Sequence, residues 1–464
     1  MTRFAAIDQG TTSTRCIVFD DSGAWHLAGS LRHAQRQPAP QWCEHDPEEL
    51  LANIRKVLAG AGTVDGIGLA NQGESCLAWE AGSGRPLSPV IVWQDARTGA
   101  ALAALPPDAA ATSLRISGLP LDPYFSASKL AWLCRELPGV AEARGRGRLR
   151  LGTTDAFFRE RLTGVCATDA ATASRTGLLD LATGDWSAEL CALHGVPIDA
   201  LPEIGPVRGP LGLIGGVPLG VSIVDQQAAL YGHGCRTPGA CKITFGTGAF
   251  LLVTAGDARP VAGDLLPTVA WRDGKAVTFA LEGGVYDAGS AVDWAQRLGF
   301  FSDPAELGTF ERPSALERGI VFVPALSGLA APHWDRRAAP LFIGMDQATD
   351  RRDLAQAVLE GIALLTAGLI EAAGCQVQIA GPVSIDGGLS QSSYFASFLA
   401  RVSGREIAVP AMHELTAAGL AGLGGIDLAP LRAGVARFLP DRPLTQAERT
   451  HAAGALERAR HWRL

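Results

Sequence analysis

The feature of this sequence that most restricts its fold is a strand–turn–strand pattern that occurs twice. FAAID (4–8) and CIVFD (16–20) flank the polar turn QGTTSTR, and KITFGTGAFLLVTAG (242–256) repeats the plan with different residues. Apolar runs on either side of a glycine turn predict β-hairpins. We therefore expect two similar lobes, each presenting a hairpin turn to the cleft between them.

Length and composition indicate a globular protein of several domains. The chain has 464 residues, of which 47% are hydrophobic and 19% charged, and its formal net charge is −7. This balance is not that of a disordered chain, and it lacks the basic character of a nucleic-acid binder. The N-terminus has no apolar signal core, and the nine scattered cysteines indicate no disulfide framework. We expect a cytoplasmic protein that binds neither nucleic acid nor membrane.

One apolar stretch is long enough to need an explanation. Leu354 to Ala373 contains Gln356, Glu360 and Glu371, so it is no uninterrupted membrane span. It predicts a buried helix that ends at Gly374 as a C-cap.

Two other apolar runs stop abruptly at polar clusters. VDGIGLA (64–70) ends at NQGE, and PVIVW (89–93) ends at QDAR. This pattern is typical of parallel strands whose carboxyl ends carry functional groups.

Three glycine turns are candidate phosphate or nucleotide contacts: DQGTT (8–12), FGTGAF (245–250) and DGG (386–388). Backbone N–H groups in such turns bind phosphate oxygens, and Asp8 at the end of its strand is suited to Mg²⁺, usually through water. Each turn alone is equally explained as an ordinary hairpin connection. GxxxxGK[ST] and GxGxxG are absent, so a nucleotide site would have to combine separated turns.

Asp225 and an aromatic cluster are candidates for the chemistry of the acceptor. Asp225 follows the apolar run VSIV, where it could take a proton from a substrate hydroxyl during phosphoryl transfer; the alternative is a helix N-cap. Glu74, Trp93 and Tyr124 offer the carboxylate and aromatic surfaces that a polyol site uses. Packing roles explain the two aromatic residues equally well.

Taken in order, these motifs resemble the FGGY carbohydrate kinases, and within them the glycerol-kinase-like branch. The resemblance covers residues 3 to about 425 and is carried by DQGTTSTR, NQGES, IVWQDART, LDPYFSASK, TDAATASRT, VDQQAALYG, TFGTGAF, ALEGG, FVPALSGLAAPHWD and DGG. It implies an α/β fold of two actin-like (ribonuclease-H-like) lobes with an ATP and substrate cleft between them. It also implies an ATP-dependent kinase that uses Mg²⁺ and phosphorylates a terminal hydroxyl of a small polyol or sugar.

The resemblance also implies where the sites lie. Residues 1–233 would form the lobe with the polyol site and the first phosphate turn, and residues 234–464 the lobe with the adenosine site and the second turn. Asp225 would be the general base, and Asp8 would lie near Mg²⁺. The implied polyol-site residues are Gly73, Glu74, Trp93, Tyr124, Asp225 and Gln226. The implied ATP-site residues are Thr11, Thr12, Ser13, Arg15, Gly246, Thr247, Gly248, Gly289, Gly387 and Gly388.

Departures from the family pattern bear on the acceptor. Gly73 stands where glycerol kinases have an arginine that binds a glycerol hydroxyl, and Val224 stands where a glycine is usual. Losing that donor and freeing its volume favours a four- or five-carbon polyol or ketose over glycerol. The alternative is a glycerol kinase, forming glycerol 3-phosphate, in which another arginine such as Arg97 reaches the same position. A non-catalytic ATP-binding sensor on the same fold is a more distant alternative, and a homodimer is left open.

Two further departures concern the nucleotide and regulation. Ser392 and Asp293 replace amide side chains expected near the nucleotide, so the adenine contacts should differ. Between Ile214 and Pro218 only GGV remains of the glycine-rich loop that binds fructose 1,6-bisphosphate in some bacterial glycerol kinases. We expect no regulation through that site, and inhibition by the bisphosphate would contradict this.

Overall fold

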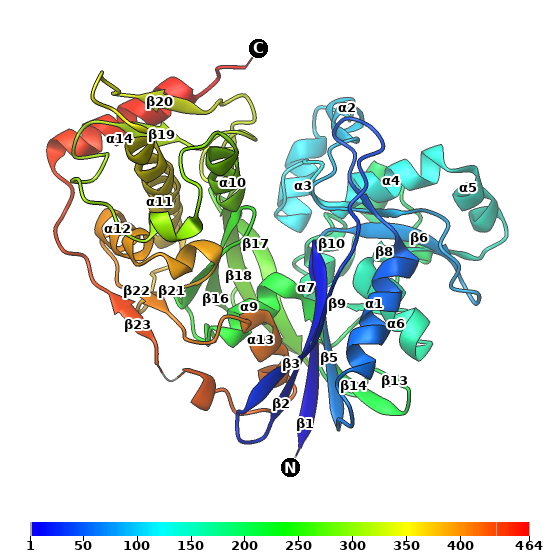
Figure 1. Cartoon of the computed structure of the whole chain (residues 1–464). Helices are drawn as coiled ribbons and strands as arrows, with labels where there is room; N and C mark the ends of the chain where they lie inside the picture. Colours follow the sequence, from blue (N-terminus) through cyan, green and yellow to red (C-terminus); the bar gives the residue numbers. More distant parts are fainter. Residues whose placement is uncertain (1, 433, 464) are drawn as a thin grey trace.

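The computed structural model describes residues 2–432 and 434–463. Figure 1 shows two lobes, each built around one large sheet. The first sheet has the strand order β13-β14-β5-β1-β2-β3, in which β1, β2 and β3 are antiparallel neighbours and β5 and β14 run parallel to β1. Its strands are β1 (Arg3–Gln9), β2 (Ser13–Asp20), β3 (Trp25–Arg32), β5 (Gly66–Asn71), β13 (Leu213–Ile214) and β14 (Val217–Val224).

The second sheet repeats this plan. Its order is β17-β18-β16-β15-β21-β22-β23, with β15 and β16 forming the hairpin and β21 and β22 running parallel to β15. The run β18-β16-β15-β21-β22 thus matches β3-β2-β1-β5-β14, which confirms the predicted repeat and the two-lobed α/β fold. Its strands are β15 (Cys241–Phe245), β16 (Ala249–Gly256), β17 (Leu266–Asp273), β18 (Ala276–Val285), β21 (Val383–Gly387), β22 (Ile407–Val409) and β23 (Ala436–Phe438).

Side chains of β1 alternate between two cores, because successive residues of a strand face opposite sides of the sheet. Ala5 and Ile7 pack in one core with α1 (Pro47–Ala59), whereas Phe4 and Ala6 pack in another with α13 (Leu415–Leu423). α13 also packs against α9 (Asp225–Gly232). A helix from the second half of the chain therefore completes the first lobe, and the division at 233/234, between α9 and β15, stays a prediction.

A small four-stranded antiparallel sheet with the order β4-β7-β6-β8 extends the first lobe. The prediction of a parallel strand over residues 89–93 is wrong. Only Val90–Ile91 (β7) form a strand, and they pair antiparallel with β4 and β6 in this small sheet. Both residues are fully buried, so the apolar run reflects burial and carries no information on strand direction.

The remaining elements of the first lobe surround these two sheets. They are β4 (Glu44–His45), β6 (Cys76–Glu80), β8 (Leu149–Thr153), β9 (Ala167–Asp169), β10 (Leu179–Asp180), β11 (Asp185–Trp186), β12 (Glu203–Gly205), α2 (Gly99–Ala103), α3 (Ala109–Ser117), α4 (Ser126–Glu136), α5 (Pro138–Gly145), α6 (Thr154–Thr163), α7 (Ala170–Ser174) and α8 (Ala188–His194). The second lobe adds α10 (Gly289–Arg297), α11 (Arg351–Gln376), α12 (Ser393–Ser403), α14 (Gln446–Ala459), β19 (Val321–Val323) and β20 (Leu341–Ile343).

α11 is the long apolar helix predicted from the sequence, but its ends differ from the prediction. Asp350 caps it in a capping box with Asp353, and it continues through Gly374 until Val377 adopts an extended conformation. Gly374 has a right-handed backbone and empty space around it, so nothing stops the helix there. Of the described helices, α11 alone is apolar and long enough to cross a membrane by length and composition, and it packs inside the core of the second lobe.

Candidate active site

Two carboxylates and a polar loop meet at one edge of the first sheet. Asp8 lies near the end of β1, Asp225 follows β14, and Asn71 ends β5 between them, with Gln9 and Val224 as its register partners. The carboxyl ends of these three parallel strands lie side by side, which places Asp8, Asp225 and the loop after β5 together. The predicted parallel strand within residues 64–70 is confirmed as β5, whereas the function of the polar residues after it stays a prediction.

This edge concentrates negative charge away from bulk water. Burial, together with the charges of Asp8 and Glu74, raises the pKa of Asp225 to about 8. Burial and the charge of Glu414 likewise raise the pKa of Asp8 to about 7. Glu74 is also raised to a pKa of about 7 by burial, although Arg175 opposes the shift. Pairs of perturbed carboxylates in a cleft are typical of catalytic sites.

Glu74 is held in a conformation that side chains rarely adopt. Its φ is +57°, in the left-handed region, and its carbonyl accepts a hydrogen bond of 2.9 Å from Ser126 Oγ. Strain of this kind persists only where the surroundings enforce it, and it is common at functional sites.

Trp93, Tyr124 and Phe250 form an aromatic wall beside these carboxylates. Trp93 has its ring centroid 5.7 Å from that of Tyr124 and 6.1 Å from that of Phe250, with edge-to-face geometry. Trp93 Nε1 donates to Thr11 Oγ1 at 3.0 Å, which ties this wall to the first phosphate turn.

Val224 occupies part of the space beside Gly73. A Cβ added at Gly73 would lie 3.1 Å from Cγ2 of Val224. The two departures from the family pattern are therefore in contact, and the valine fills some of the room that the glycine leaves.

The arginine beside Glu74 is Arg175 rather than Arg97. Arg97 donates to Asp95 and Glu44 and stacks on Trp42 and Trp132, so it is not the arginine of the alternative in which another arginine reaches the acceptor position. Arg175 follows α7, is buried, and places its Nε 2.8 Å from Glu74 Oε1.

Gln226 and a buried lysine complete the acceptor side. Lys242 Nζ lies 2.5 Å from Gln226 Oε1 and 3.0 Å from Thr244 Oγ1. The backbone N–H of Gln226 donates to Asp225 Oδ1 at 2.7 Å. Because Lys242 holds the amide oxygen of Gln226, the amide nitrogen is left to donate to a ligand.

The first glycine turn is open to solvent at its tip. Gly10 donates its N–H to the Ser13 carbonyl at 3.0 Å, while Thr12 is exposed and the residues on either side of it are partly exposed. Arg15 lies on β2 opposite Asp8, and its Nη1 forms an ion pair of 2.8 Å with Glu414. Thr11, Thr12 and Ser13 thus fit a phosphate turn, and within the described part of the chain Arg15 is engaged through Nη1 only.

The second turn borders a large pocket in the second lobe. Its cavity volume is about 440 Å³, within the range of small-ligand sites. Gly246, Gly289 and Gly388 line it, as do Asp293 and Ser392, the two residues that depart from the family pattern near the nucleotide. Thr247 is exposed beside Gly246, whereas Gly248 is buried behind the turn and Gly387 lies next to Gly388 at the end of β21.

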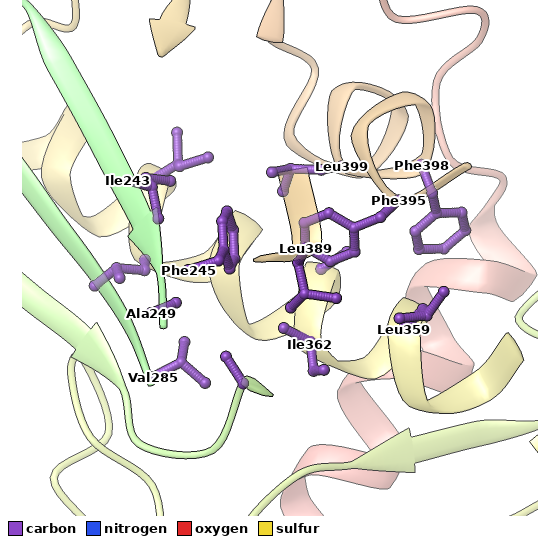
Figure 2. Close-up of a cluster of buried hydrophobic side chains, with 14 of the residues drawn as sticks. Ile243, Phe245, Ala249, Val285, Leu359, Ile362, Leu389, Phe395, Phe398 and Leu399 are labelled. Carbon is purple, nitrogen blue, oxygen red and sulfur yellow. The ribbon is translucent and has the colours of Figure 1, made fainter. Parts of the chain in front are cut away.

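The hydrophobic core of the second lobe supports this pocket. Figure 2 shows Phe245 at the end of its strand beside Leu389, with Phe395 beyond them. The ring centroids of Phe245 and Phe395 are 4.9 Å apart, and Phe245, Leu359 and Leu389 line the pocket. The turn that follows Phe245 therefore begins from a rigidly packed position.

Gly289 is required by the close approach of two segments. Its N–H donates to the Gly246 carbonyl at 3.0 Å, and a Cβ at position 289 would lie 2.5 Å from that same oxygen. This contact fixes the second turn against the start of α10.

Comparison with known proteins assigns the family. The FGGY family of carbohydrate kinases matches with its N-terminal domain over residues 4–232 and with its C-terminal domain over residues 241–428. The chain belongs to the FGGY family of carbohydrate kinases. It is 40% identical to a glycerol kinase of Thermus brockianus, with 98% of each chain covered. It is also 40% identical to a glycerol kinase of Bordetella parapertussis, covering 91% of this chain and 88% of the relative.

Solved structures agree with this assignment. The structure of Plasmodium falciparum glycerol kinase with ADP matches this FGGY kinase with a TM-score of 0.89 at 29% identity, covering 99% of this chain and 98% of the other. A xylulose kinase from Rhodospirillum rubrum shares the fold, with a TM-score of 0.82 at 23% identity over 98% and 97% of the two chains. The protein is an ATP-dependent carbohydrate or polyol kinase of the glycerol-kinase-like branch, which removes the alternative of a non-catalytic sensor.

Sequence reasoning assigned no role to three residues of this FGGY kinase that the structure places at the site: Arg175, Lys242 and Glu282. Arg175 and Glu282 lie within TDAATASRT and ALEGG, two motifs that carry the resemblance, and Lys242 opens the second strand–turn–strand repeat. A charged residue inside an otherwise apolar or small-residue motif was the available signal.

Proposed function

We propose that this kinase transfers the γ-phosphate of ATP to a terminal hydroxyl of glycerol, giving glycerol 3-phosphate and ADP in the cytoplasm. The observation that carries the proposal is the 40% identity to glycerol kinases along 98% of the chain. The contact of Val224 with the space beside Gly73 and the buried arginine beside Glu74 support it, because the reasons for expecting a longer acceptor were free volume and a missing arginine.

In this proposal Asp225 acts as the general base. As the acceptor oxygen bonds to the γ-phosphorus and the bond to the β-phosphate oxygen breaks, the hydroxyl proton passes to the Asp225 carboxylate. Glu74 and Gln226 hold the other hydroxyls, and Trp93 and Tyr124 cover the carbon chain. The aromatic wall also excludes water, which would otherwise compete as acceptor.

The nucleotide occupies the pocket between the second turn and α10. The backbone of Gly246, Thr247 and Gly248 and that of Thr11 to Ser13 approach the phosphates from opposite lobes. Gly289, Gly387 and Gly388 leave space for the adenosine. Arg15, which pairs with Glu414 through Nη1, would contact the phosphates through its Nε or Nη2.

The residues at the first turn fit a magnesium ion held mainly by phosphate oxygens and water. Asp8 Oδ1 is buried and has no hydrogen-bond partner among the described residues, as expected of an atom awaiting a cation or its water. No group of three or more candidate ligand side chains occurs in the described ranges. Mg²⁺ bound there would neutralise charge that develops on the phosphates.

An ADP-release assay tests the acceptor. Glycerol is compared with erythritol, D- and L-threitol, the pentitols, xylulose, ribulose and dihydroxyacetone, with Asp225→Asn as the inactive control. We expect the highest kcat/KM with glycerol. A higher value for a longer polyol or ketose would overturn the proposal and return the acceptor to the four- or five-carbon class.

A further inference from the structure

Arg175 connects the two lobes inside the cleft. It lies just after α7 in the first lobe, and α7 packs against β17 of the second lobe, at the centre of Figure 1. Its Nε donates to Glu74 Oε1 at 2.8 Å, and its Nη2 donates to Glu282 Oε1 at 3.0 Å. Only 2% of the arginine is exposed.

The third nitrogen of this guanidinium is unused. Arg175 Nη1 is buried and has no hydrogen-bond partner within residues 2–432 and 434–463. An arginine presents five N–H donors in a fixed fork, and buried donors of charged groups are rarely left unpaired. A missing partner at this position indicates a ligand or an ordered water.

The cavity beside Arg175 has the chemistry of a hydroxyl site. Arg175 and Glu282 line a volume of about 40 Å³ together with Tyr124 and Phe250, the aromatic residues that face Trp93. A water needs only about 10–15 Å³ of such volume, so a hydroxyl group fits with space to spare. The cavity therefore adjoins the proposed acceptor site and offers a charged donor within mostly apolar walls.

Arg97 shows what distinguishes Arg175. Arg97 is also buried, pairs with two carboxylates and has an unpartnered Nη1 among the described residues. Its guanidinium carbon, however, lies 3.7 Å from the ring centroid of Trp42 and 4.7 Å from that of Trp132. Arg175 has one aromatic face, Phe125, at 5.5 Å, and a cavity beside it, whereas Arg97 lies against two closer rings.

We propose that Arg175 Nη1 donates a hydrogen bond to a non-reacting hydroxyl of the acceptor and thereby determines specificity for it. A hydroxyl oxygen accepts a hydrogen bond from an N–H, whereas a hydrogen or a methyl group in its place cannot, so this donor selects for a hydroxyl. The inference rests on the proposed function and names the donor that Gly73 does not supply.

Deoxy acceptors and two arginine variants test the inference. The wild-type kinase is assayed with glycerol, with 1,3-propanediol, which lacks the central hydroxyl, and with 1,2-propanediol, which lacks one terminal hydroxyl. We expect Arg175→Lys to lose at least about tenfold in kcat/KM on glycerol, mostly through a higher KM. On the diol that lacks the hydroxyl bound by Arg175, the same variant should lose at most about twofold. Arg97→Lys is the matched control, which should lower the unfolding temperature and leave the ratio between acceptors unchanged.

The outcomes separate this inference from the proposed function. Wild-type turnover of glycerol tests the function alone. If glycerol is a good substrate and Arg175→Lys loses activity equally on all three acceptors, Arg175 is a structural residue and the inference is wrong. Should that variant not fold, NMR of the wild-type enzyme with ¹⁵N-labelled arginine decides. An Nη signal that is absent from Arg175→Gln is assigned to Arg175. A shift of this signal on adding glycerol without ATP supports the inference, and no shift overturns it.

Discussion

Replacing Asp225 with asparagine should inactivate the kinase and stabilise its fold. Asparagine has the same shape as aspartate but does not ionise, so it removes the base without leaving a cavity. We expect kcat to fall by about 10²–10⁴ while ATP binding is retained. The gain in stability follows from the pKa of Asp225, which burial raises from 3.8 to about 8.

The sign of the stability effect is set by which state holds the proton. Between these two pKa values the folded protein keeps a proton on Asp225 that the unfolded chain releases, so the free energy of unfolding falls as pH rises through this window. The loss is at most about 1.36 kcal/mol per pH unit, or about 2.7 kcal/mol from pH ~5.5 to pH ~7.5. Because Asp225 faces the cleft and keeps part of its surface exposed, we expect about 1 kcal/mol, on the order of 1 °C in Tm for a chain of this length.

The assay is thermal unfolding of both proteins across this pH range, beside an ADP-release assay at each pH. The Tm of Asp225→Asn should exceed that of the wild type by a margin that grows with pH. A margin that stays constant or shrinks would refute the reasoning about burial. Turnover within about tenfold of wild type would refute the assignment of the base.

Three further substitutions probe the rest of the site. Gly73→Arg should lower kcat/KM for the acceptor at least about tenfold, because the new side chain collides with Val224. Adding Val224→Gly should restore activity, and no restoration would contradict the volume argument. Lys242→Met should move the acidic limb of the kcat/KM profile to higher pH, because the charge of Lys242 lowers the pKa of Asp225; an unmoved limb would show that Lys242 has no such influence. Gly289→Ala should raise the KM for ATP several-fold, whereas Gly374→Ala, whose Cβ meets open space in α11 and does not line the pocket, serves as the control. Equal effects would refute the role of the close contact.

Local patterns in the sequence were sufficient for much of the fold and for part of the site. The hairpin turns, the repeat and the placement of Asp225 after an apolar strand all depend on residues within about ten positions of one another. The brevity of β7 and the extension of α11 past Gly374 depend instead on what packs around them, which no local pattern records.

Contacts between distant segments could not be predicted. Arg175 meets Glu74 across 101 positions and Glu282 across 107, so the sequence alone gave no reason to prefer it over Arg97. The same holds for Val224, whose side chain fills the space beside Gly73 only because β14 and β5 are neighbours.

The position of α13 has a consequence for how the chain is made. One apolar side of the first sheet is covered by residues 412–428, although the strands of that sheet end at Val224. At about 5–20 residues per second, a ribosome needs roughly 10–40 s to add the intervening residues. During that interval Phe4 and Ile17 remain exposed on the nascent chain. The first lobe is thus begun before the second lobe and completed only after most of the second lobe has been synthesised.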